Sequence, residues 1–264
     1  MNSNPESEIP IVQPGKSFLL AVRFYATMLF MLFYWPLGVL VVMIICLCSS
    51  MLNPGEKHRT LGQLVIGKSL SSFVRILEWA GIIRIHDAGL IGKADMPGPL
   101  LIASNHPALW DAPLLIRRFL RVSCIMKAEL LNNPLLRNGA LFAGFLPNTP
   151  RLEMIHAALD RLKNNGRLLF FPEGTRTRNR DKGGILNRFR PGLALLASQS
   201  KAPVLPVFIS SNSLYLQKGW PIWRLPPLPI TVTIRVGDPM KIGEGESTRD
   251  FSRRLEELFR KELG

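Results

Sequence analysis

The sequence predicts an α/β fold with a mostly parallel central sheet flanked by helices, preceded by an N-terminal membrane helix or helical hairpin. Two observations lead to this prediction. From residue 82 onward, short apolar segments alternate with stretches of helical periodicity, an order typical of strand–helix–strand units around a parallel sheet. Before that point, residues 24–48 contain no charged side chain. A run of this kind is typical of a segment that enters a membrane.

The composition is that of a folded chain that binds anions. Hydrophobic residues make up 47% of the 264 residues, which excludes a disordered chain. The 33 basic and 19 acidic residues leave a net charge of +14. This charge favours an anionic partner, such as nucleic acid, lipid headgroups, a phosphorylated substrate or an acidic carrier protein. The 3 cysteines cannot form a disulfide framework and lack the spacing of a zinc site.

The hydropathy pattern divides the chain into a flexible tail (1–16), a membrane-embedded segment (17–52) and an α/β domain (53–264). The apolar run 24–48 corresponds to about 37 Å of helix, enough to cross a hydrocarbon core of about 30 Å. It exceeds the apolar region of a signal peptide, about 7–15 residues. Pro36 removes a backbone donor in the middle of the run. The run is therefore either one kinked span or two short helices that enter one leaflet.

Basic side chains follow the apolar run, at Lys57, Arg59, Lys68 and Arg75. The positive-inside rule then predicts that the domain faces the cytoplasm, on a bacterial-type inner membrane. Residues 61–80 carry apolar side chains at helical spacing. They predict an amphipathic helix that is either packed on the domain or lies on the membrane.

The rest of the chain predicts alternating strands and helices, followed in order. Strands are expected at 82–86, 100–103, 122–126, 168–171, 204–209 and 230–236. Helices are expected at 112–119, 134–144, 152–164, 190–200 and 248–262. Residues 219–229 are rich in proline and aromatics and predict an irregular loop, with membrane contact as one interpretation. Parallel sheets place their ligand sites beyond the carboxyl ends of the strands.

The first residues that can carry chemistry, His106 and Asp111, follow the expected strand 100–103. Their separation of five residues is not the spacing of one helix face, so a contact between them requires a turn. With that turn, Asp111 accepts the proton of one imidazole nitrogen and leaves the other as a base. The chain contains no G-x-S-x-G motif, so the base would act on a hydroxyl of the substrate. The structural alternative is that Asp111 only caps a helix.

The second group of candidate residues follows the expected strand 168–171 and reads Pro-Glu-Gly-Thr-Arg from residue 172 to 176. Gly174 permits close backbone approach, and Arg176 and Arg178 supply planar donor forks suited to phosphate oxygens. The basic run continues with Arg180, Lys182, Arg188 and Arg190. A run of this kind is either an anion site or a solvated basic face. Its position after an apolar strand and a Glu-Gly turn favours the anion site.

Together, His-x4-Asp at 106–111 and Phe-Pro-Glu-Gly-Thr-Arg at 171–176 resemble the motifs of the glycerolipid acyltransferase family, typified by bacterial 1-acyl-glycerol-3-phosphate acyltransferase. Three further segments are similar to the family: Met-Lys-Ala-Glu-Leu at 126–130, Phe-Arg-Pro-Gly at 189–192 and Pro-Val-Leu-Pro-Val at 203–207. The similarity extends over about residues 60–240.

This resemblance implies a role for each matching residue. His106 would be the general base that deprotonates the acceptor hydroxyl, and Asp111 would orient and stabilise the imidazole. The residues implied at the glycerol-phosphate headgroup are Lys127, Arg151, Glu173, Gly174, Thr175 and Arg176. The hydroxyl would attack a thioester directly, without a covalent acyl-enzyme. Neither a metal nor a cofactor is implied, and acyl-CoA or acyl carrier protein would supply the acyl chain as a substrate.

Two departures from the family pattern leave the acceptor open. Ala108 stands where a polar residue is frequent, and the spacing from Gly144 to Arg151 is slightly longer than usual. An acceptor such as lyso-ornithine lipid is therefore an alternative to 1-acyl-glycerol-3-phosphate. A membrane-tethered nucleic-acid-binding protein is a remote alternative, because the arginines gather around one turn rather than along a groove with stacking aromatics. The expected partners are membrane lipids, a lysophospholipid and an acyl donor, with no nucleic acid.

Overall fold

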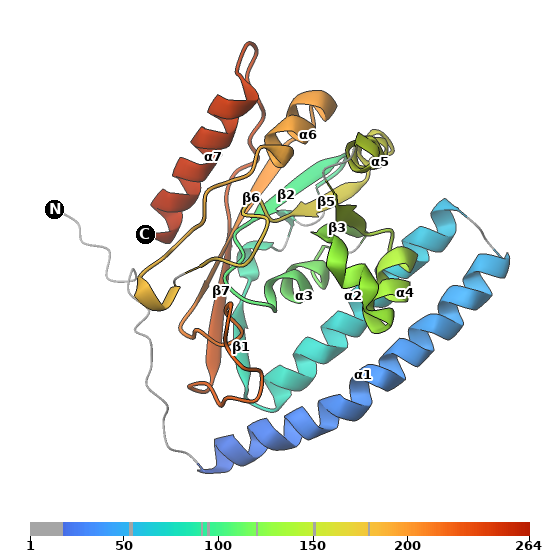
Figure 1. Cartoon of the computed structure of the whole chain (residues 1–264), viewed down its shortest axis with the longest axis vertical. Helices are drawn as coiled ribbons and strands as arrows, with labels where there is room; N and C mark the ends of the chain where they lie inside the picture. Colours follow the sequence, from blue (N-terminus) through green and yellow to red (C-terminus); the bar gives the residue numbers. More distant parts are fainter. Residues whose placement is uncertain are drawn as a thin grey trace.

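The computed structural model describes residues 18–52, 55–90, 92–93, 96–119, 121–149, 152–178 and 180–264. Within these residues the chain forms a central sheet with helices on both faces and one long helix outside them (Figure 1). The expected tail at 1–16 and the candidate residue Arg151 lie outside the described residues.

The sheet has seven strands in the order β1-β7-β6-β2-β5-β3-β4. Their bounds are β1 (Ile83–His86), β2 (Leu100–Ser104), β3 (Val122–Lys127), β4 (Leu146–Asn148), β5 (Arg167–Phe170), β6 (Val204–Ser211) and β7 (Ile230–Val236). Only β6 and β7 pair antiparallel, and every other neighbouring pair is parallel. The carboxyl ends of β6, β2, β5, β3 and β4 therefore meet at one edge. The expected mostly parallel sheet is confirmed.

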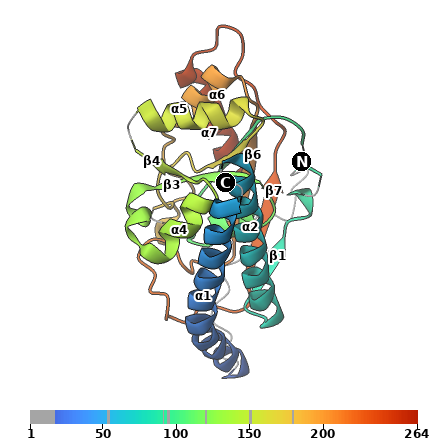
Figure 2. The ribbon, with the colours of Figure 1, turned by 90° about the vertical axis from the view of Figure 1, so that its right-hand side faces the viewer.

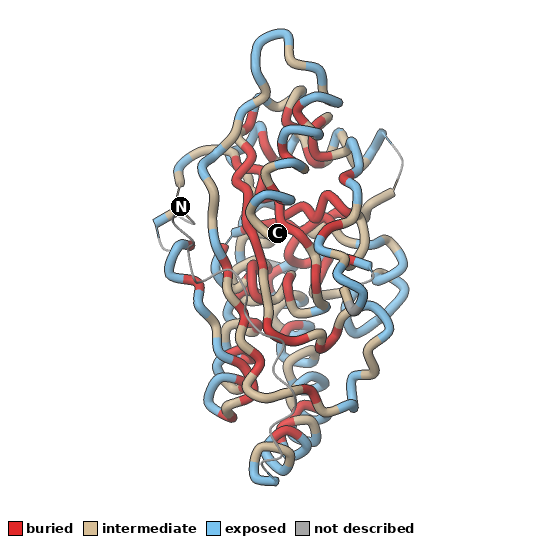
Figure 3. The backbone as a smooth tube through the Cα atoms, turned by 90° about the vertical axis from the view of Figure 1, so that its left-hand side faces the viewer, coloured by how far each residue is buried: buried red, intermediate tan, exposed pale blue. Residues whose placement is uncertain are grey.

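Helices cover both faces of the sheet. On one face lie α2 (Glu56–Trp79) and α3 (Asp111–Ile116), and on the other lie α5 (Leu152–Lys163), α6 (Gly192–Ser200) and α7 (Thr248–Leu263). Neighbouring residues of a strand point to opposite faces, so Ile102 packs in the α2 layer and Leu101 in the α6 and α7 layer. Buried residues concentrate along the central strands (Figure 3). The strands that end at the candidate site, β2 and β5, are therefore buried in the core.

The long helix α1 (Phe18–Leu52) is continuous through Pro36 and forms an antiparallel hairpin with α2 (Figures 1 and 2). Directly before Pro36, two contacts hold α1 to α2. The hydroxyl of Tyr34 donates to the carbonyl of Ser69 at 3.2 Å, and the rings of Trp35 and Phe73 lie 5.1 Å apart. Both contacts come from residues directly before the proline, and α1 runs through Pro36 as one helix, so the alternative of two short helices is not what the structure forms.

The structure also shows how the expected amphipathic helix packs, and it contains one strand that was not expected. The amphipathic helix expected at 61–80 begins at Glu56 and packs on the domain, with Leu70, Phe73, Val74 and Leu77 buried. Helix α4 (Pro134–Phe142) lies against both α1 and α2. Strand β4 was not expected from the sequence. It has only three residues, one of them Pro147, and proline is tolerated there because β4 is an edge strand.

Candidate active site

The His106 turn lies between the carboxyl end of β2 and the start of α3. It brings the imidazole Nδ1 of His106 to 2.9 Å from Oδ2 of Asp111, and the same oxygen accepts a hydrogen bond from the backbone N–H of Ala108 at 2.7 Å. Asp111 is the first residue of α3, whose N-cap is Trp110. The Asp111 side chain therefore points back into the turn, toward His106, and does not cap the helix.

The environment of this pair fixes the imidazole. Its ring stacks on Phe171, with 4.2 Å between the ring centroids. Because an ionised carboxylate only accepts hydrogen bonds, Nδ1 carries the proton and Nε2 has a free lone pair. Burial raises the pKa of Asp111, while the hydrogen bonds from His106 and Ala108 and the charge of Arg180 act in the opposite direction. The pair is arranged as a base with an oriented free nitrogen.

Glu173 joins the two motifs. It follows β5, the strand beside β2, and its Oε1 accepts a hydrogen bond from the backbone N–H of His106 at 2.8 Å. The hydroxyl of Thr177 lies 2.9 and 3.0 Å from its two oxygens, and Oε2 also accepts the backbone N–H of Asn187 at 2.8 Å. The backbone N–H of Thr177 in turn donates to the carbonyl of His106 at 2.7 Å. Glu173 is thus buried, and desolvation raises its pKa.

Gly174 lets the chain turn directly after Glu173. Its φ of +68° lies in the left-handed region, and a Cβ there would come within 2.6 Å of Nε of Arg190. The backbone N–H of Arg190 also donates to the carbonyl of Pro172 at 2.8 Å, which holds the two segments together. Thr175, the next residue, is half-buried beside this turn. A side chain at position 174 would therefore disturb the carboxylate that supports His106.

Arg176 binds a segment that is distant in the sequence. Its Nη1 donates to the carbonyls of Leu216 and Gln217 at 2.8 and 3.2 Å. The carbonyl of Leu216 also accepts the backbone N–H of Leu109, in the His106 turn, at 3.2 Å. The segment after β6 therefore closes over both motifs, and one guanidinium nitrogen of Arg176 is used in holding it.

Arg180 is a further cation of the site, and the sequence indicated it only as part of a basic run. Its side chain is half-buried, and its charge acts on both Asp111 and Glu173. Burial lowers the pKa of Arg180, and the two carboxylates oppose that effect. In the described part of the chain, its side chain makes one hydrogen bond, from Nη1 to the carbonyl of Ser213 at 3.5 Å. Most of its donors are therefore available.

Asn105 is a second residue that sequence reasoning missed. Its amide donates to the carbonyl of Ile209 at 2.8 Å and accepts the backbone N–H of the same residue at 2.8 Å. This clamp ties the end of β2 to β6 directly before His106. Its position next to His106 was the one sequence signal that could have indicated it.

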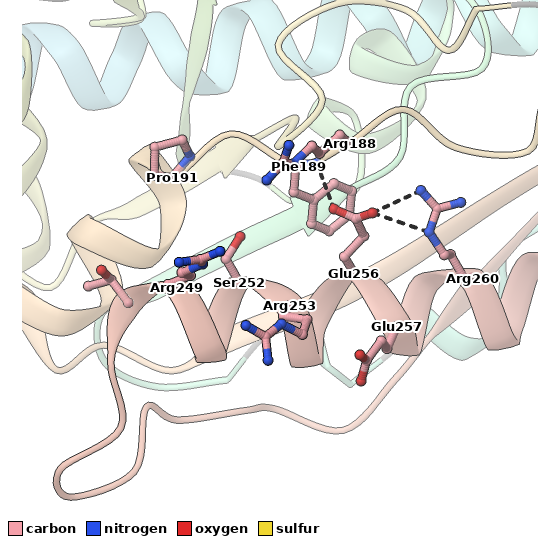
Figure 4. Close-up of a pocket in the computed structure, with 10 residues that line it drawn as sticks. Arg188, Phe189, Pro191, Arg249, Ser252, Arg253, Glu256, Glu257 and Arg260 are labelled. Atoms are coloured by element: carbon pink, nitrogen blue, oxygen red, sulfur yellow. Dashed lines mark hydrogen bonds and ion pairs between the residues drawn. The ribbon is translucent and has the colours of Figure 1, made fainter.

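Of the candidate residues that the structure describes, Lys127 is not brought to the pair. Lys127 lies at the end of β3, two strands from β2, and its exposed ammonium pairs with Glu129 at 3.2 Å. A groove of about 600 Å³ lies between α7 and residues 188–191, and its lining includes Arg188, Arg249 and Arg253 (Figure 4). Among the described candidate site residues, none lines this groove.

Known proteins are similar to this chain in sequence. The family model described as Acyltransferase matches residues 87–210, a stretch that contains both motifs. The 1-acyl-sn-glycerol-3-phosphate acyltransferase of Pseudomonas aeruginosa is 30% identical over 159 residues, covering 57% of this chain and 57% of the relative. The enzyme of the same description from Cocos nucifera is 30% identical over 156 residues, covering 55% of this chain and 47% of the relative. The chain thus spans about half the length of these curated relatives.

A solved structure agrees with the fold over nearly the whole chain. The crystal structure of a 1-acyl-sn-glycerophosphate acyltransferase from Thermotoga maritima superposes with a TM-score of 0.67 at 21% identity, covering 93% of this chain and 94% of that one. The likeness extends beyond the sheet domain to the N-terminal helices. The family model spans both motifs, and the chain shares its architecture with this solved structure.

Proposed function

We propose that this protein transfers an acyl chain from acyl-CoA or acyl carrier protein to the free hydroxyl of 1-acyl-sn-glycerol-3-phosphate, which gives phosphatidic acid. The observation that carries the proposal is the hydrogen bond between His106 and Asp111 at the carboxyl end of β2, with Nε2 left free. The relatives from Pseudomonas aeruginosa and Cocos nucifera are described as 1-acyl-sn-glycerol-3-phosphate acyltransferases, and this supports the choice of acceptor.

In the proposed reaction, Nε2 of His106 takes the proton of the acceptor hydroxyl as the hydroxyl oxygen attacks the thioester carbonyl carbon. The tetrahedral intermediate collapses when the carbon–sulfur bond breaks, and the imidazolium returns its proton to the leaving thiolate. The products are one ester and one thiol. The negative charge of Asp111 stabilises the imidazolium between these two proton transfers. Glu173 positions His106 through its backbone N–H and does not meet the reacting atoms.

Positive charge near the pair would bind the acceptor phosphate. Arg180 keeps most of its donors free beside Asp111, and Arg176 retains Nε and Nη2 for a ligand. Planar guanidinium groups of this kind bind phosphate oxygens in pairs. Gly174 and Thr175 line the turn that carries Arg176. Lys127 and Arg151 remain proposed sources of additional positive charge for the headgroup.

Helix α1 would attach the enzyme to the membrane. It is long and apolar enough to cross a bilayer, and 11% of its most apolar window is buried in the protein. Phe33, Leu37 and Leu47 are among its exposed side chains, and a continuous apolar surface of this length indicates a membrane contact.

The packing of α2 along α1 favours an orientation of α1 in the membrane plane. Exposed Lys57, Lys68 and Arg75 are distributed along α2, and an α1 that crossed the bilayer would bring some of them into hydrocarbon. With α1 at the interface, these cations lie among the lipid headgroups. We place the domain on the cytoplasmic side, where the inner leaflet is anionic and attracts the net charge of +14.

An acceptor and donor panel tests the proposed function. The purified protein is incubated in lipid vesicles with acyl-CoA or acyl carrier protein and with 1-acyl-glycerol-3-phosphate, monoacylglycerol or lyso-ornithine lipid. The proposal expects phosphatidic acid with at least one of the two donors. If lyso-ornithine lipid alone is acylated, the acceptor is wrong and the chemistry stands. If no acceptor reacts with either donor, the proposed function is wrong.

A further inference from the structure

The loop at residues 213–229, between β6 and β7, turns its apolar side chains outward. Ile222 is 52% exposed and Trp223 is 71% exposed. The polar groups of the same loop are bonded internally. The hydroxyl of Tyr215 donates to the carbonyl of Ile222 at 2.9 Å, and Nε1 of Trp220 donates to the carbonyl of Arg224 at 3.2 Å. An ordered loop with satisfied polar groups and exposed apolar ones has the composition of a binding surface.

The loop lies at the same end of the molecule as the beginning of α1 and the end of α2, as both Figure 1 and Figure 2 show. The ring of Tyr215 packs against Phe24 of α1, with 5.9 Å between their centroids. The two helix ends also expose aromatic side chains, Phe18 at the start of α1 and Trp79 at the end of α2. Large apolar side chains from three elements therefore gather beside the exposed face of α1.

The chemistry of the loop tip fits a bilayer surface. Tryptophan concentrates at membrane–water interfaces, where its ring is partly apolar and its N–H finds polar partners. The basic residues Lys218 and Arg224 flank Ile222 and Trp223, and the guanidinium of Arg224 stacks 4.7 Å from the Trp220 ring. A protein partner that bound this tip would also have to accommodate the lipid-facing surface of α1. We propose that the 213–229 loop is a second lipid contact, inserting Ile222 and Trp223 into the leaflet that holds α1.

The inner half of the same loop contacts the catalytic turn. Tyr215 packs edge-on against Trp110, which directly precedes Asp111, with 5.3 Å between the rings. The carbonyl of Leu216 accepts hydrogen bonds from Leu109 and Arg176. One end of the loop therefore holds the His106 turn while the other faces lipid. In this arrangement the loop sets the position of the site above the bilayer, and this consequence rests on the proposed function.

A fluorescent reporter tests the lipid contact without using activity. Trp223→Cys is made in a background with Cys46→Ser and Cys48→Ser and is labelled with an environment-sensitive fluorophore. The remaining native cysteine, Cys124, is buried in β3 and does not compete for the label. Vesicles of phosphatidylglycerol and phosphatidylcholine are expected to shift the emission to the blue and to protect it from an aqueous quencher.

The matched control carries the label at Leu152→Cys, a position that is 72% exposed on α5, on the opposite face of the sheet from α1 and α2. Its emission is expected to stay unchanged when vesicles are added. No shift at position 223, or equal shifts at 223 and 152, would overturn the proposal. Neither result depends on the enzyme's acceptor, so a failure here is distinct from a failure of the proposed function.

A second comparison measures the contribution of the loop. The double variant Ile222→Ser/Trp223→Ser is compared with the double variant Leu152→Ser/Ile185→Ser, after circular dichroism shows that both are folded. Affinity for vesicles is expected to fall about tenfold or more for the loop variant and to stay unchanged for the control. The KM for a vesicle-borne acceptor rises correspondingly, while the KM for a short-chain acceptor in free solution does not. Unchanged vesicle affinity in the loop variant would contradict the proposal.

Discussion

Oε1 of Glu173 accepts a hydrogen bond from the backbone N–H of His106 at 2.8 Å, across 67 residues of sequence. The second motif thereby sets the backbone position of the histidine in the first motif. Both Glu173 oxygens are occupied by donors, from Thr177 to each and from Asn187 to Oε2. This explains why a carboxylate stands at the position: an amide would have only one oxygen for donors on both sides.

Glu173→Gln is therefore expected to destabilise the fold and to slow catalysis. Its amide N–H₂ would face the backbone N–H of either His106 or Asn187, and an unsatisfied buried donor costs about 1–3 kcal/mol. Urea unfolding in detergent measures the free energy of unfolding, and the kcat of acyl transfer gives the second readout. The control is Glu129→Gln, because that exposed carboxylate pairs only with Lys127 at the surface. Equal unfolding free energies for the parent and Glu173→Gln would contradict this role.

Asp111→Asn is expected to behave differently, since the hydrogen bonds from His106 and Ala108 to the Asp111 side chain both go to Oδ2. The asparagine can keep its oxygen in that place, so the turn is retained while the negative charge is lost. The kcat is expected to fall about 100-fold or more, because the negative charge that contacts the imidazolium directly is lost.

Stability at neutral pH is expected to rise in the same variant. Burial raises the pKa of Asp111, so the folded state holds the proton more tightly than the unfolded state does. The parent therefore loses stability as the pH rises above the ordinary range of an aspartate, and the asparagine does not titrate. Thermal unfolding at pH 7 measures the difference. A variant that was less stable than the parent and fully active would refute both expectations.

Arg180→Gln tests the proposed phosphate contact. Loss of one charge-assisted hydrogen bond is worth about 1.5–3 kcal/mol, which is about 10–100-fold in affinity. We expect the KM for 1-acyl-glycerol-3-phosphate to rise by that factor and the KM for monoacylglycerol to stay unchanged, because monoacylglycerol has no phosphate. Arg188→Gln, an exposed arginine in the groove beside α7, serves as the control. Equal losses with both acceptors would show that Arg180 does not bind the phosphate.

Cys124 makes the stability of the domain sensitive to alkaline pH. Burial raises the pKa of this thiol to about 12. In the unfolded chain a thiol ionises at about pH 8.5. The unfolded state therefore loses its proton first, and stability falls as the pH rises between these values, by about 2 kcal/mol at pH 10.

The measurement compares the parent with Cys124→Ala by urea unfolding at pH 7 and pH 10. The free energy of unfolding of the variant is lower than that of the parent at pH 7, because a buried sulfur is removed. This difference is expected to shrink by about 2 kcal/mol at pH 10. Tyr215, whose pKa burial also raises to about 12, titrates in both proteins and cancels in the comparison. A deficit that stayed constant with pH would show that Cys124 is not the source.

Much of the fold followed from local sequence signals. Apolar runs such as 100–103 and 204–209 predicted buried central strands, because a strand covered on both faces has no polar positions. Strand β4 was not predicted, because a strand of three residues that includes a proline shows no periodicity. The effect of Pro36 could not be predicted from α1 alone, since the contacts of Tyr34 and Trp35 with α2 decide that the helix continues.

The candidate site was predictable to the level of neighbouring strand ends. His106 follows β2 and Glu173 follows β5, and paired parallel strands bring such residues together. The sequence could not indicate that Glu173 supports the His106 backbone, because nothing in spacing fixes which atom a carboxylate meets. The closing segment at Leu216 was also missed, since loops carry no periodic signal and its contacts with Arg176 and Leu109 are tertiary.

The proposed function requires His106 to activate the acceptor hydroxyl directly. The measurement that tests it is the rate of thiol release from the acyl donor, with and without 1-acyl-glycerol-3-phosphate, for the parent and for folded His106→Ala. We expect thiol release by the parent only when the acceptor is present, in a one-to-one ratio with phosphatidic acid, and a loss of about 100-fold or more in the variant. A variant that kept the parent's rate, or a burst of thiol from the parent without acceptor, would contradict it.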